Sequence, residues 1–255
     1  MVYQTGRTGA HLGGSLSLVE ILVALYSKYV RYDPGNPSSE SRDRVILSKG
    51  HAALALYPTL AEFGIIDENL LSTFKQNGSK LGGHPSLNGL PGIEFSSGSL
   101  GQGLSYGVGV GLALKKKSNS TSKIYVILGD GECDEGSVWE SIMSASHFHL
   151  NNLVAIVDVN KIQYDGGTES VMNLEPLREK WEYFGWNVSV VDGHDLTDLM
   201  NSLDTAQDSA RPTVILAQTV KGKGISFMEN NPKYHNSYLS QEQYAEALKE
   251  LGGAQ

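Results

Sequence analysis

The chain has 255 residues, 40% of them hydrophobic, which is enough apolar material for the packed core of a globular protein. Its formal net charge of -8, from 28 acidic and 20 basic residues, gives no sign of a surface for nucleic acid or an anionic membrane, so a small-molecule substrate is expected. One cysteine, Cys133, excludes an intrachain disulfide, and no run of about 18 apolar residues predicts a membrane span, so we expect a cytoplasmic protein.

The predicted elements alternate between strands and helices along the chain. Short, continuously apolar runs rich in valine and isoleucine are typical of strands covered on both faces, and they occur at 45–47, 124–128, 153–157, 188–191 and 214–217. Helical patterns mark 17–29, 137–148, 196–203 and 241–251. Ser17 and Glu20 have the spacing of a capping box, and Asp195 is an expected N-cap. The alternation predicts an α/β fold with a mostly parallel sheet and helices on both faces, formed by one domain over residues 1–255.

Two polar side chains follow neighbouring predicted strands. Asp130 lies between two glycines just after the run 124–128, and Asn160 follows the run 153–157 about thirty residues later, with a predicted helix between them. A right-handed strand-helix-strand crossover brings both strand ends to one edge of the sheet, so the two side chains can share one ion. One carboxylate with one neutral amide suits Mg²⁺ bound to a diphosphate, because the diphosphate supplies most of the negative charge.

This segment, GDGECDEGSVWESIMSASHFHLNNLVAIVDVNKIQYDG, closely resembles the thiamine diphosphate motif of the transketolase family. The resemblance implies a thiamine diphosphate-binding fold in which the side chains of Asp130 and Asn160 and the backbone carbonyl of Ile162 bind Mg²⁺, with Ca²⁺ or Mn²⁺ as substitutes. It also implies that Gly131 and Asn160 contact the diphosphate of thiamine diphosphate.

Four of the seven histidines lie in segments that resemble transketolase signatures. These are GAHLGGSLSLVEILVALY with His11, SRDRVILSKGHA with His51, GGHPSLNGLPGIEFSSGSLGQG with His84, and KGKGISFMENNPKYHNS with His235. The resemblance implies that His11, His84 and His235 bind sugar hydroxyls and transfer protons. It places His51 against the diphosphate and has His235 shared between substrate and cofactor. It further implies backbone contacts to the cofactor from the turn Gly98, Ser99 and Leu100.

The resemblance covers essentially the whole chain but only the first domain of a transketolase. In that family, the glutamate that activates the cofactor lies in a second, pyrimidine-binding domain, and neither it nor the basic clamp for sugar phosphates has a counterpart here. We therefore expect the N-terminal subunit of a two-component transketolase, which transfers a two-carbon ketol unit from a ketose to an aldose or between their phosphates. The expected partner is a homologous C-terminal subunit in an α2β2 heterotetramer.

Two other functions are open at this stage. A two-component acyloin or acyl-transfer enzyme would share the cofactor motif and use an unusual ketose or a 2-oxoacid as donor, although four histidines suited to a polyol favour a sugar. An inactive regulatory or binding subunit would retain the fold alone, and the intact pair Asp130 and Asn160 argues against such decay.

The remaining histidines and the helical glycines have structural interpretations. His147 and His149 lie two apart near a predicted helix end, so they point to different sides. His194 is expected to brace the turn before the N-cap Asp195, and the glycines at 107, 109 and 111 to allow close helix packing. Glu135 marks either a helix start or an acidic position that lies near the dimer interface in transketolases.

Overall fold

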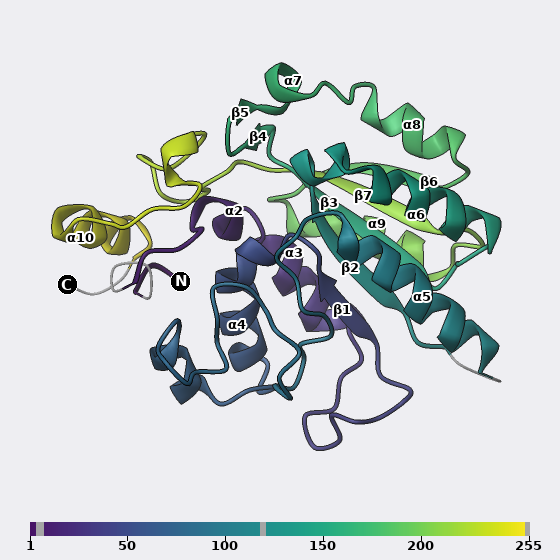
Figure 1. The fold of residues 1–255 in the computed structure, drawn as a ribbon, viewed down its shortest axis with the longest axis horizontal. Helices are drawn as coiled ribbons and strands as arrows, with labels where there is room; N and C mark the ends of the chain where they lie inside the picture. Colours follow the sequence, from purple (N-terminus) through teal and green to yellow (C-terminus); the bar gives the residue numbers. More distant parts are fainter. Residues whose placement is uncertain (4–7, 118–120, 253–255) are drawn as a thin grey trace.

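The protein is described by a computed structural model that covers residues 1–3, 8–117 and 121–252. Its centre is a five-stranded parallel sheet with the strand order β1-β2-β3-β7-β6 (Figure 1). The strands are β1 (Arg44–Leu47), β2 (Ile124–Gly129), β3 (Leu153–Val159), β6 (Asn187–Asp192) and β7 (Thr213–Gln218). All the predicted strands are confirmed, each one or two residues longer than its apolar run.

The sheet is covered on both faces because its side chains alternate between two cores. On β2, Tyr125 and Ile127 belong to one core, whereas Val126 and Leu128 belong to the other. One face carries α5 (Gln102–Lys116), α6 (Gly136–His147) and α8 (Leu177–Tyr183), and the other carries α3 (Val19–Ala24), α4 (Ala53–Glu62) and α9 (Leu196–Gln207) (Figure 1). The predicted arrangement with helices on both faces is confirmed.

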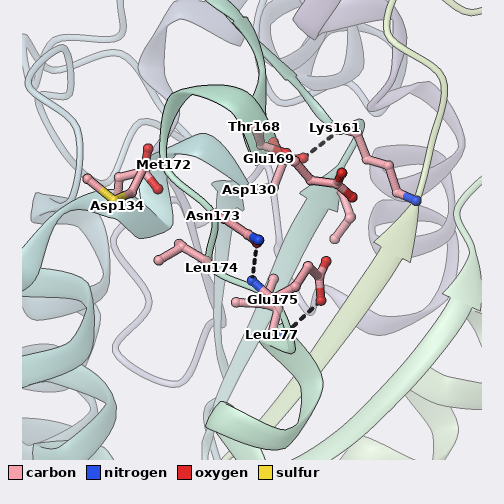
Figure 2. A pocket seen from close by; sticks show the side chains of 11 residues that line it. Asp130, Asp134, Lys161, Thr168, Glu169, Met172, Asn173, Leu174, Glu175 and Leu177 are labelled. Carbon is pink, nitrogen blue, oxygen red and sulfur yellow. Dashed lines mark hydrogen bonds between the residues drawn. The ribbon is translucent and has the colours of Figure 1, made fainter.

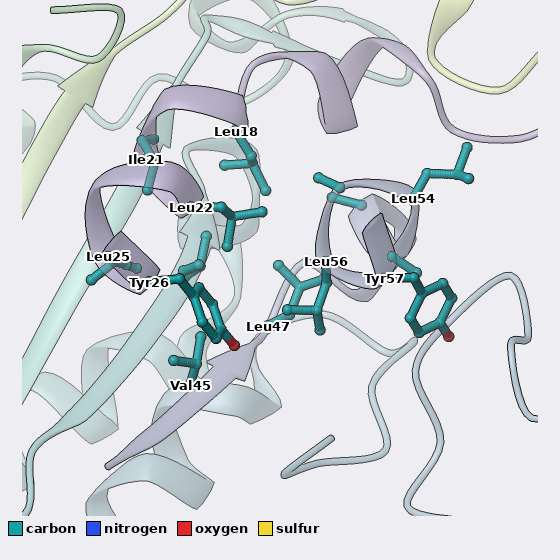
Figure 3. Packing of buried hydrophobic residues seen from close by; sticks show 14 of the residues in the cluster. Leu18, Ile21, Leu22, Leu25, Tyr26, Val45, Leu47, Leu54, Leu56 and Tyr57 are labelled. Atoms are coloured by element: carbon teal, nitrogen blue, oxygen red, sulfur yellow. The ribbon is translucent and has the colours of Figure 1, made fainter. Parts of the chain in front are cut away.

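The core beneath α3 and α4 anchors the first strand. Figure 3 shows Leu22 and Tyr26 gathered with Val45 of β1, and Leu56 of α4 beside Leu47. Each fully buried side chain of this size contributes on the order of 1.5–3 kcal/mol relative to exposure. The strands are therefore fixed by packing on both sides, and the loops at their carboxyl ends extend from a rigid base.

The predicted helix at 17–29 begins later than expected. α3 starts after Leu18 without a side-chain cap and passes into a π-helical turn at Leu25–Tyr29. The capping box predicted for Ser17 and Glu20 is wrong, because Ser17 Oγ donates to the Gly14 carbonyl at 3.2 Å and to Asp158 Oδ2 at 2.7 Å. A buried carboxylate far along the chain therefore binds the hydroxyl that was expected to cap the helix.

The other predicted helices are confirmed as α6, α9 and α10 (Gln241–Glu250). Asp195 is the N-cap of α9, as predicted, and its Oδ1 accepts the Thr197 N–H at 2.7 Å. Several helices were not predicted from the sequence, and α4 and α8 are two of them. Most of α4 is buried, so its nearly continuous apolar run has no helical period, and it contains Pro58. α8 has only 7 residues, among which Leu177 and Trp181 are buried.

Close packing explains one of the helical glycines. A Cβ at Gly107 would lie 2.7 Å from Val126 Cγ2, so glycine allows α5 to approach β2, as predicted, whereas a Cβ at Gly109 would meet open space. The short elements include α2 (Gly13–Leu16), the antiparallel pair β4 (Ile162–Gln163) and β5 (Gly166–Gly167), α7 (Thr168–Val171), and 3₁₀ turns at Gly50–Ala52, Glu68–Thr73, Gly131–Asp134 and Pro232–Tyr234. Within the described ranges, no helix is long and apolar enough to cross a membrane.

Candidate active site

Asp130 lies at the carboxyl end of β2, directly beside the end of β3. Gly129 pairs with Asp158 in the sheet register, and the Asp130 N–H donates to the Asp158 carbonyl at 3.1 Å. The Asp130 carboxylate accepts the N–H of Gly131 at 2.8 Å and that of Lys161 at 2.5 Å. Burial, followed by the nearby Asp158 charge, raises the pKa of Asp130 to about 6. Two backbone donors therefore fix this carboxylate where a cation would offset the cost of its burial.

Asn160 follows β3 and lies on the same edge of the sheet. Its Nδ2 donates to Asp158 Oδ2 at 2.9 Å, and its Oδ1 accepts the Ile162 N–H at 3.1 Å. The Ile162 carbonyl accepts from Lys221 Nζ at 2.7 Å. Asp130, Asn160 and Ile162 all line one cavity of about 210 Å³. The three groups predicted to bind a metal are therefore neighbours in space.

The oxygen donors at this cavity suit a hard cation that arrives with a ligand. Asp130, Asn160 and Ile162 offer one carboxylate, one amide oxygen and one backbone carbonyl, whereas Mg²⁺ takes six oxygen ligands. Within residues 1–3, 8–117 and 121–252, no three His, Cys, Asp or Glu side chains come together as a metal site. A diphosphate and water would have to supply the remaining ligands, so this donor set fits a metal-diphosphate complex.

Glycine makes room at this end of the cavity. A Cβ at Gly131 would lie 2.2 Å from Gln163 Oε1 and 3.0 Å from Gln163 Cβ, so a larger residue would displace that side chain. Gly131 and Leu100 line the cavity. Gly98 and Ser99 lie outside it, and a Cβ at Gly98 would lie 3.9 Å from the His84 ring. The predicted turn therefore reaches the cavity through Leu100.

The four predicted histidines form one cluster although they come from four separate segments. The ring of His11 has its centroid 5.4 Å from His51, 5.7 Å from His84 and 5.4 Å from His235. His51 and His235 are stacked with centroids 5.2 Å apart, and both line the cavity of the metal-binding groups. The exposed ring of Tyr164 meets His235 edge-on at 5.4 Å. The histidine predicted to contact the diphosphate and the histidines predicted to bind sugar hydroxyls are therefore neighbours.

The imidazoles of this cluster are held in their neutral forms. Burial lowers the pKa of His11 to about 4 and that of His235 to about 3, and nearby lysines add to the effect. Burial also lowers the pKa of His51 and of His84. At neutral pH each ring therefore carries one N–H donor and one acceptor nitrogen, which suits hydrogen bonding to hydroxyl groups.

Two buried lysines border the cavity and were missed in the sequence. Lys221 Nζ bridges the Ile162 carbonyl and His235 Nδ1 at 2.7 and 2.8 Å, and burial lowers the pKa of Lys221 to about 8. Lys49 forms an ion pair with Asp158 in which both side chains are buried. Both lysines directly precede a glycine in a segment that follows a strand, and this was the available signal.

Glu132 is a third missed residue and joins the loops around the cavity. Its Oε1 accepts the Gly101 N–H at 2.8 Å and the Ser48 hydroxyl, and its Oε2 accepts the Gly129 N–H at 3.1 Å. Burial raises the pKa of Glu132, partly offset by these donors. The carboxylate therefore connects the ends of β1 and β2 with the glycine turn before α5.

The other three histidines lie apart from this cluster. His147 ends α6 and its ring contacts Phe148, and His149 follows in the left-handed region with φ 50°. His194 Nε2 accepts the Val220 N–H at 2.9 Å, so its Nδ1 donates to Glu20 Oε2 at 3.0 Å. His194 therefore braces the segment that leads to the cavity lysine as well as its own turn.

A second, smaller depression is lined by Asp130 and by Leu177, the first residue of α8 (Figure 2). Asp134, Glu169 and Glu175 contribute carboxylates to its wall. Its volume of about 30 Å³ is room for a few water molecules at most, and Glu175 Oε2 accepts the Leu177 N–H at 2.9 Å. The depression is too small for a cofactor, whereas the 210 Å³ cavity is roomier and brings the predicted metal-binding groups together with His51 and His235.

Comparisons of the sequence with known proteins all point to one family. The family model described as the transketolase thiamine diphosphate-binding domain matches residues 3–255. The chain is 42% identical over 250 residues to a 6-deoxy-6-sulfo-D-fructose transketolase subunit of Clostridium sp. (strain MSTE9), with 97% of this chain and 90% of that protein covered. It is 43% identical over 243 residues to an apulose-4-phosphate transketolase subunit of Actinobacillus succinogenes, with 95% and 88% covered.

Solved structures agree with this assignment. The transketolase from Campylobacter jejuni superimposes with a TM-score of 0.91 at 33% sequence identity, covering 99% of this chain and 40% of that one. A transketolase from Pichia stipitis in complex with sedoheptulose-7-phosphate also gives a TM-score of 0.91, at 31% identity. The chain belongs to the transketolase family, as a subunit of a thiamine diphosphate-dependent transferase that corresponds to the N-terminal, cofactor-binding part of the longer enzymes.

Proposed function

We propose that this chain is the N-terminal subunit of a two-component transketolase that transfers a two-carbon ketol unit from a ketose to an aldose with thiamine diphosphate and Mg²⁺. The observation that carries the proposal is the single cavity that joins Asp130, Asn160 and Ile162 to His51 and His235. Oxygen donors at one end suit a metal-bound diphosphate, and neutral imidazoles at the other suit the hydroxyl groups of a sugar.

At the metal end, Mg²⁺ is assigned to the Asp130 carboxylate, the Asn160 amide oxygen and the Ile162 carbonyl, and Ca²⁺ or Mn²⁺ would be accepted by the same oxygen donors. The diphosphate is assigned to Gly131, Asn160, His51 and the turn at 98–100. Lys221, which is buried beside the Ile162 carbonyl, adds positive charge where the diphosphate would lie.

At the histidine end, His11, His84 and His235 are assigned to the hydroxyl groups of the donor and to proton transfer. A neutral imidazole can donate to a hydroxyl oxygen or accept its proton. In the unliganded fold the lowered pKa values of His11 and His235 make these two rings weak bases, and a bound anionic diphosphate would raise their pKa values toward the range that suits proton transfer. Thiamine diphosphate, when bound, supplies the nucleophilic carbon that carries the two-carbon unit. The histidines then orient the sugar, and their partial burial limits the access of water.

The activating glutamate is assigned to a homologous C-terminal partner chain with a pyrimidine-binding domain, and the assembly to an α2β2 heterotetramer. Two relatives of similar length are named as subunits, and this chain spans 40% of the Campylobacter jejuni transketolase. Tyr106 on α5 and Met143 on α6 expose 39% and 49% of their surface, which suits burial against another chain. We treat residues 1–255 as one diphosphate-binding domain that functions with this partner.

The substrate is proposed to be a sugar phosphate or a sugar with another anionic group. The names of two relatives contain a sulfonated ketose and a sugar phosphate, 6-deoxy-6-sulfo-D-fructose and apulose-4-phosphate. The basic residues that would bind such a group are assigned to the partner chain. A cytoplasmic location stays a prediction from the single cysteine.

The proposal is tested by assaying ketol transfer with this chain, Mg²⁺ and thiamine diphosphate, first alone and then with the C-terminal partner, which we expect to be encoded in the adjacent reading frame. Transfer is expected only with both chains present. Robust activity from the isolated chain would contradict the two-component assignment. Failure of the assembled complex to bind thiamine diphosphate in a Mg²⁺-dependent manner would contradict the assignment as an enzyme.

A further inference from the structure

Asp158 is a fully buried carboxylate at the end of β3, and the proposed reaction has no step for it. Its side chain is 0% exposed, and that of its ion-pair partner Lys49 is 2% exposed. The Lys49 ammonium, Ser17 Oγ and Asn160 Nδ2 all donate to Asp158 Oδ2, and Thr219 Oγ1 donates to Oδ1. Donors from four segments of the chain thus converge on one side chain beside the candidate metal site.

The chemistry of these groups fixes which end of the Asn160 amide faces Asp158. An ionised carboxylate only accepts hydrogen bonds, so the NH₂ group of Asn160 must turn toward it. The amide oxygen then lies on the opposite side, where it accepts the Ile162 N–H at 3.1 Å and keeps a second lone pair. A reversed amide would set its oxygen against a carboxylate and present an NH₂ group to a cation.

Lys49 allows a carboxylate to remain ionised in this position. The Asp158 oxygens accept from the Lys49 ammonium and from the hydroxyl groups of Ser17 and Thr219, so donors surround the buried carboxylate. An unpaired buried charge is strongly destabilising, whereas a paired and fully hydrogen-bonded one is tolerated. The ion pair with Lys49 therefore places a hydrogen-bond acceptor beside the Asn160 amide.

We propose that Asp158 is a positioning residue that holds the Asn160 amide with its oxygen toward the Mg²⁺ position, with Lys49 as its counter-ion. The inference rests on the proposed function, because it concerns the metal assigned there. Partners that orient metal ligands typically change metal affinity about 10- to 100-fold when they are removed, and this range sets the expected effect.

The test exchanges the two side chains. Mg²⁺ is titrated calorimetrically into the full chain, assembled with its partner and saturated with thiamine diphosphate, for wild type, Asn160→Asp, Asp158→Asn and the double exchange. Asn160→Asp adds a carboxylate, which Mg²⁺ ordinarily prefers, yet we expect at least about tenfold weaker binding because two carboxylates would then face each other. The double exchange restores a donor-acceptor pair, so most of the affinity should return.

The coupling between the two positions decides the outcome. Thermal unfolding of each variant is measured beside the titration, and affinities are compared only among variants that fold. A double-mutant cycle with a coupling of about tenfold or more supports the inference. The inference would be overturned if Asn160→Asp bound Mg²⁺ as tightly as wild type. It would also be overturned if the affinity changes of the two single exchanges simply multiplied in the double exchange.

A second pair of variants covers the case in which Asp158→Asn does not fold because Lys49 loses its counter-ion. In Lys49→Met/Asp158→Asn and Lys49→Met/Asp158→Leu neither of the two positions carries a charge, and the side chains at position 158 are similar in size. The asparagine still offers an acceptor to Asn160, whereas the leucine does not. We expect the leucine variant to bind Mg²⁺ at least about tenfold more weakly, and equal affinities would overturn the inference.

Asp130→Ala separates this inference from the proposed function. If Asp130→Ala abolishes Mg²⁺ binding while positions 158 and 160 act independently, the positioning role alone is wrong. If Asp130→Ala leaves Mg²⁺ binding unchanged, the metal assignment fails and the positioning role fails with it.

Discussion

The two ends of the candidate active site are built in different ways. At the metal end, Asp130 and Asn160 follow adjacent strands, and hydrogen bonds of 2.5 to 3.1 Å connect them to backbone N–H groups and to Asp158. At the histidine end, His11, His51 and the other two rings come from separate loops, and ring contacts with centroids 5.2 to 5.7 Å apart join them.

This difference predicts that cofactor binding depends mainly on the metal end and ketol transfer on the histidine end. The sheet register sets the metal end before a ligand arrives, because Gly129 must lie opposite Asp158. In the proposed function, the histidine end is completed only when a sugar supplies hydroxyl groups for its neutral rings. Substitutions at the metal end should therefore abolish binding of the cofactor, and those at His11 or His84 should slow transfer with binding retained.

The largest expected effect is that of Asp130→Ala. Removing the one carboxylate of the proposed metal set should reduce Mg²⁺-dependent binding of thiamine diphosphate by about 100-fold or more, because a diphosphate without its metal would lie in a cavity that the Glu132 carboxylate also lines. Calorimetry on the assembled protein measures this. Asp134→Ala, four residues on, is the matched control and should leave binding unchanged. A cofactor-loaded Asp130→Ala protein would refute the metal assignment.

His84→Ala tests the histidine end. The variant should bind thiamine diphosphate as the wild type does, while kcat for ketol transfer falls by about 10²-fold or more, which is the usual contribution of a proton-transfer group. Steady-state kinetics and calorimetry on the same preparation measure the two quantities. His147→Ala, at the end of α6, is the control and should change neither. Parallel losses of binding and rate in His84→Ala would erase the distinction between the two ends.

The sequence predicted the metal end because its signal is local. Asp130 and Asn160 each follow an apolar run, and the topology of a parallel sheet then brings them together. The histidine cluster needed the family resemblance, since nothing in the spacing of His11, His84 and His235 requires their loops to meet. The geometry that carries the site was therefore predictable from elementary rules at one end only.

The residues that the sequence missed have partners far along the chain. Lys49 and Asp158 are 109 positions apart, and Ser48 and Glu132 are 84 apart. A charged residue in a loop carries no local sign of whether it will be buried, because the ion pair that permits burial exists only after folding. The wrong capping box at Ser17 has the same cause, since its hydroxyl binds a carboxylate that the local sequence does not contain.

A smaller effect is expected from pH at the metal end. Because the pKa of Asp130 is raised to about 6 in the unliganded fold, Mg²⁺ affinity should fall roughly tenfold for each pH unit below that value. Linkage has the opposite sign for stability: the fold holds this proton more tightly than the unfolded chain, so stability falls as pH rises from about 4 to about 6. Asp130→Asn should lack the contribution of Asp130 to both pH dependences. Subtracting its pH profiles of Mg²⁺ affinity and of stability from those of wild type removes the contribution of the histidines, which titrate in both proteins.

The smallest expected effect concerns the charge beside the histidines. Lys75 Nζ donates to the Gly9 carbonyl at 3.0 Å, and after burial its positive charge is the next cause of the lowered pKa of His84. Lys75→Met should therefore raise the pKa of His84, but not to the usual value of a histidine, because the burial remains. NMR titration of the imidazole C–H signals measures this, with Lys80→Met, on the same loop, as the control. A pKa of His84 that stays unchanged in Lys75→Met would mean that burial alone keeps this ring neutral. The two ends of the site would then differ even more sharply, because charges would govern the metal end and exclusion of water the histidine end.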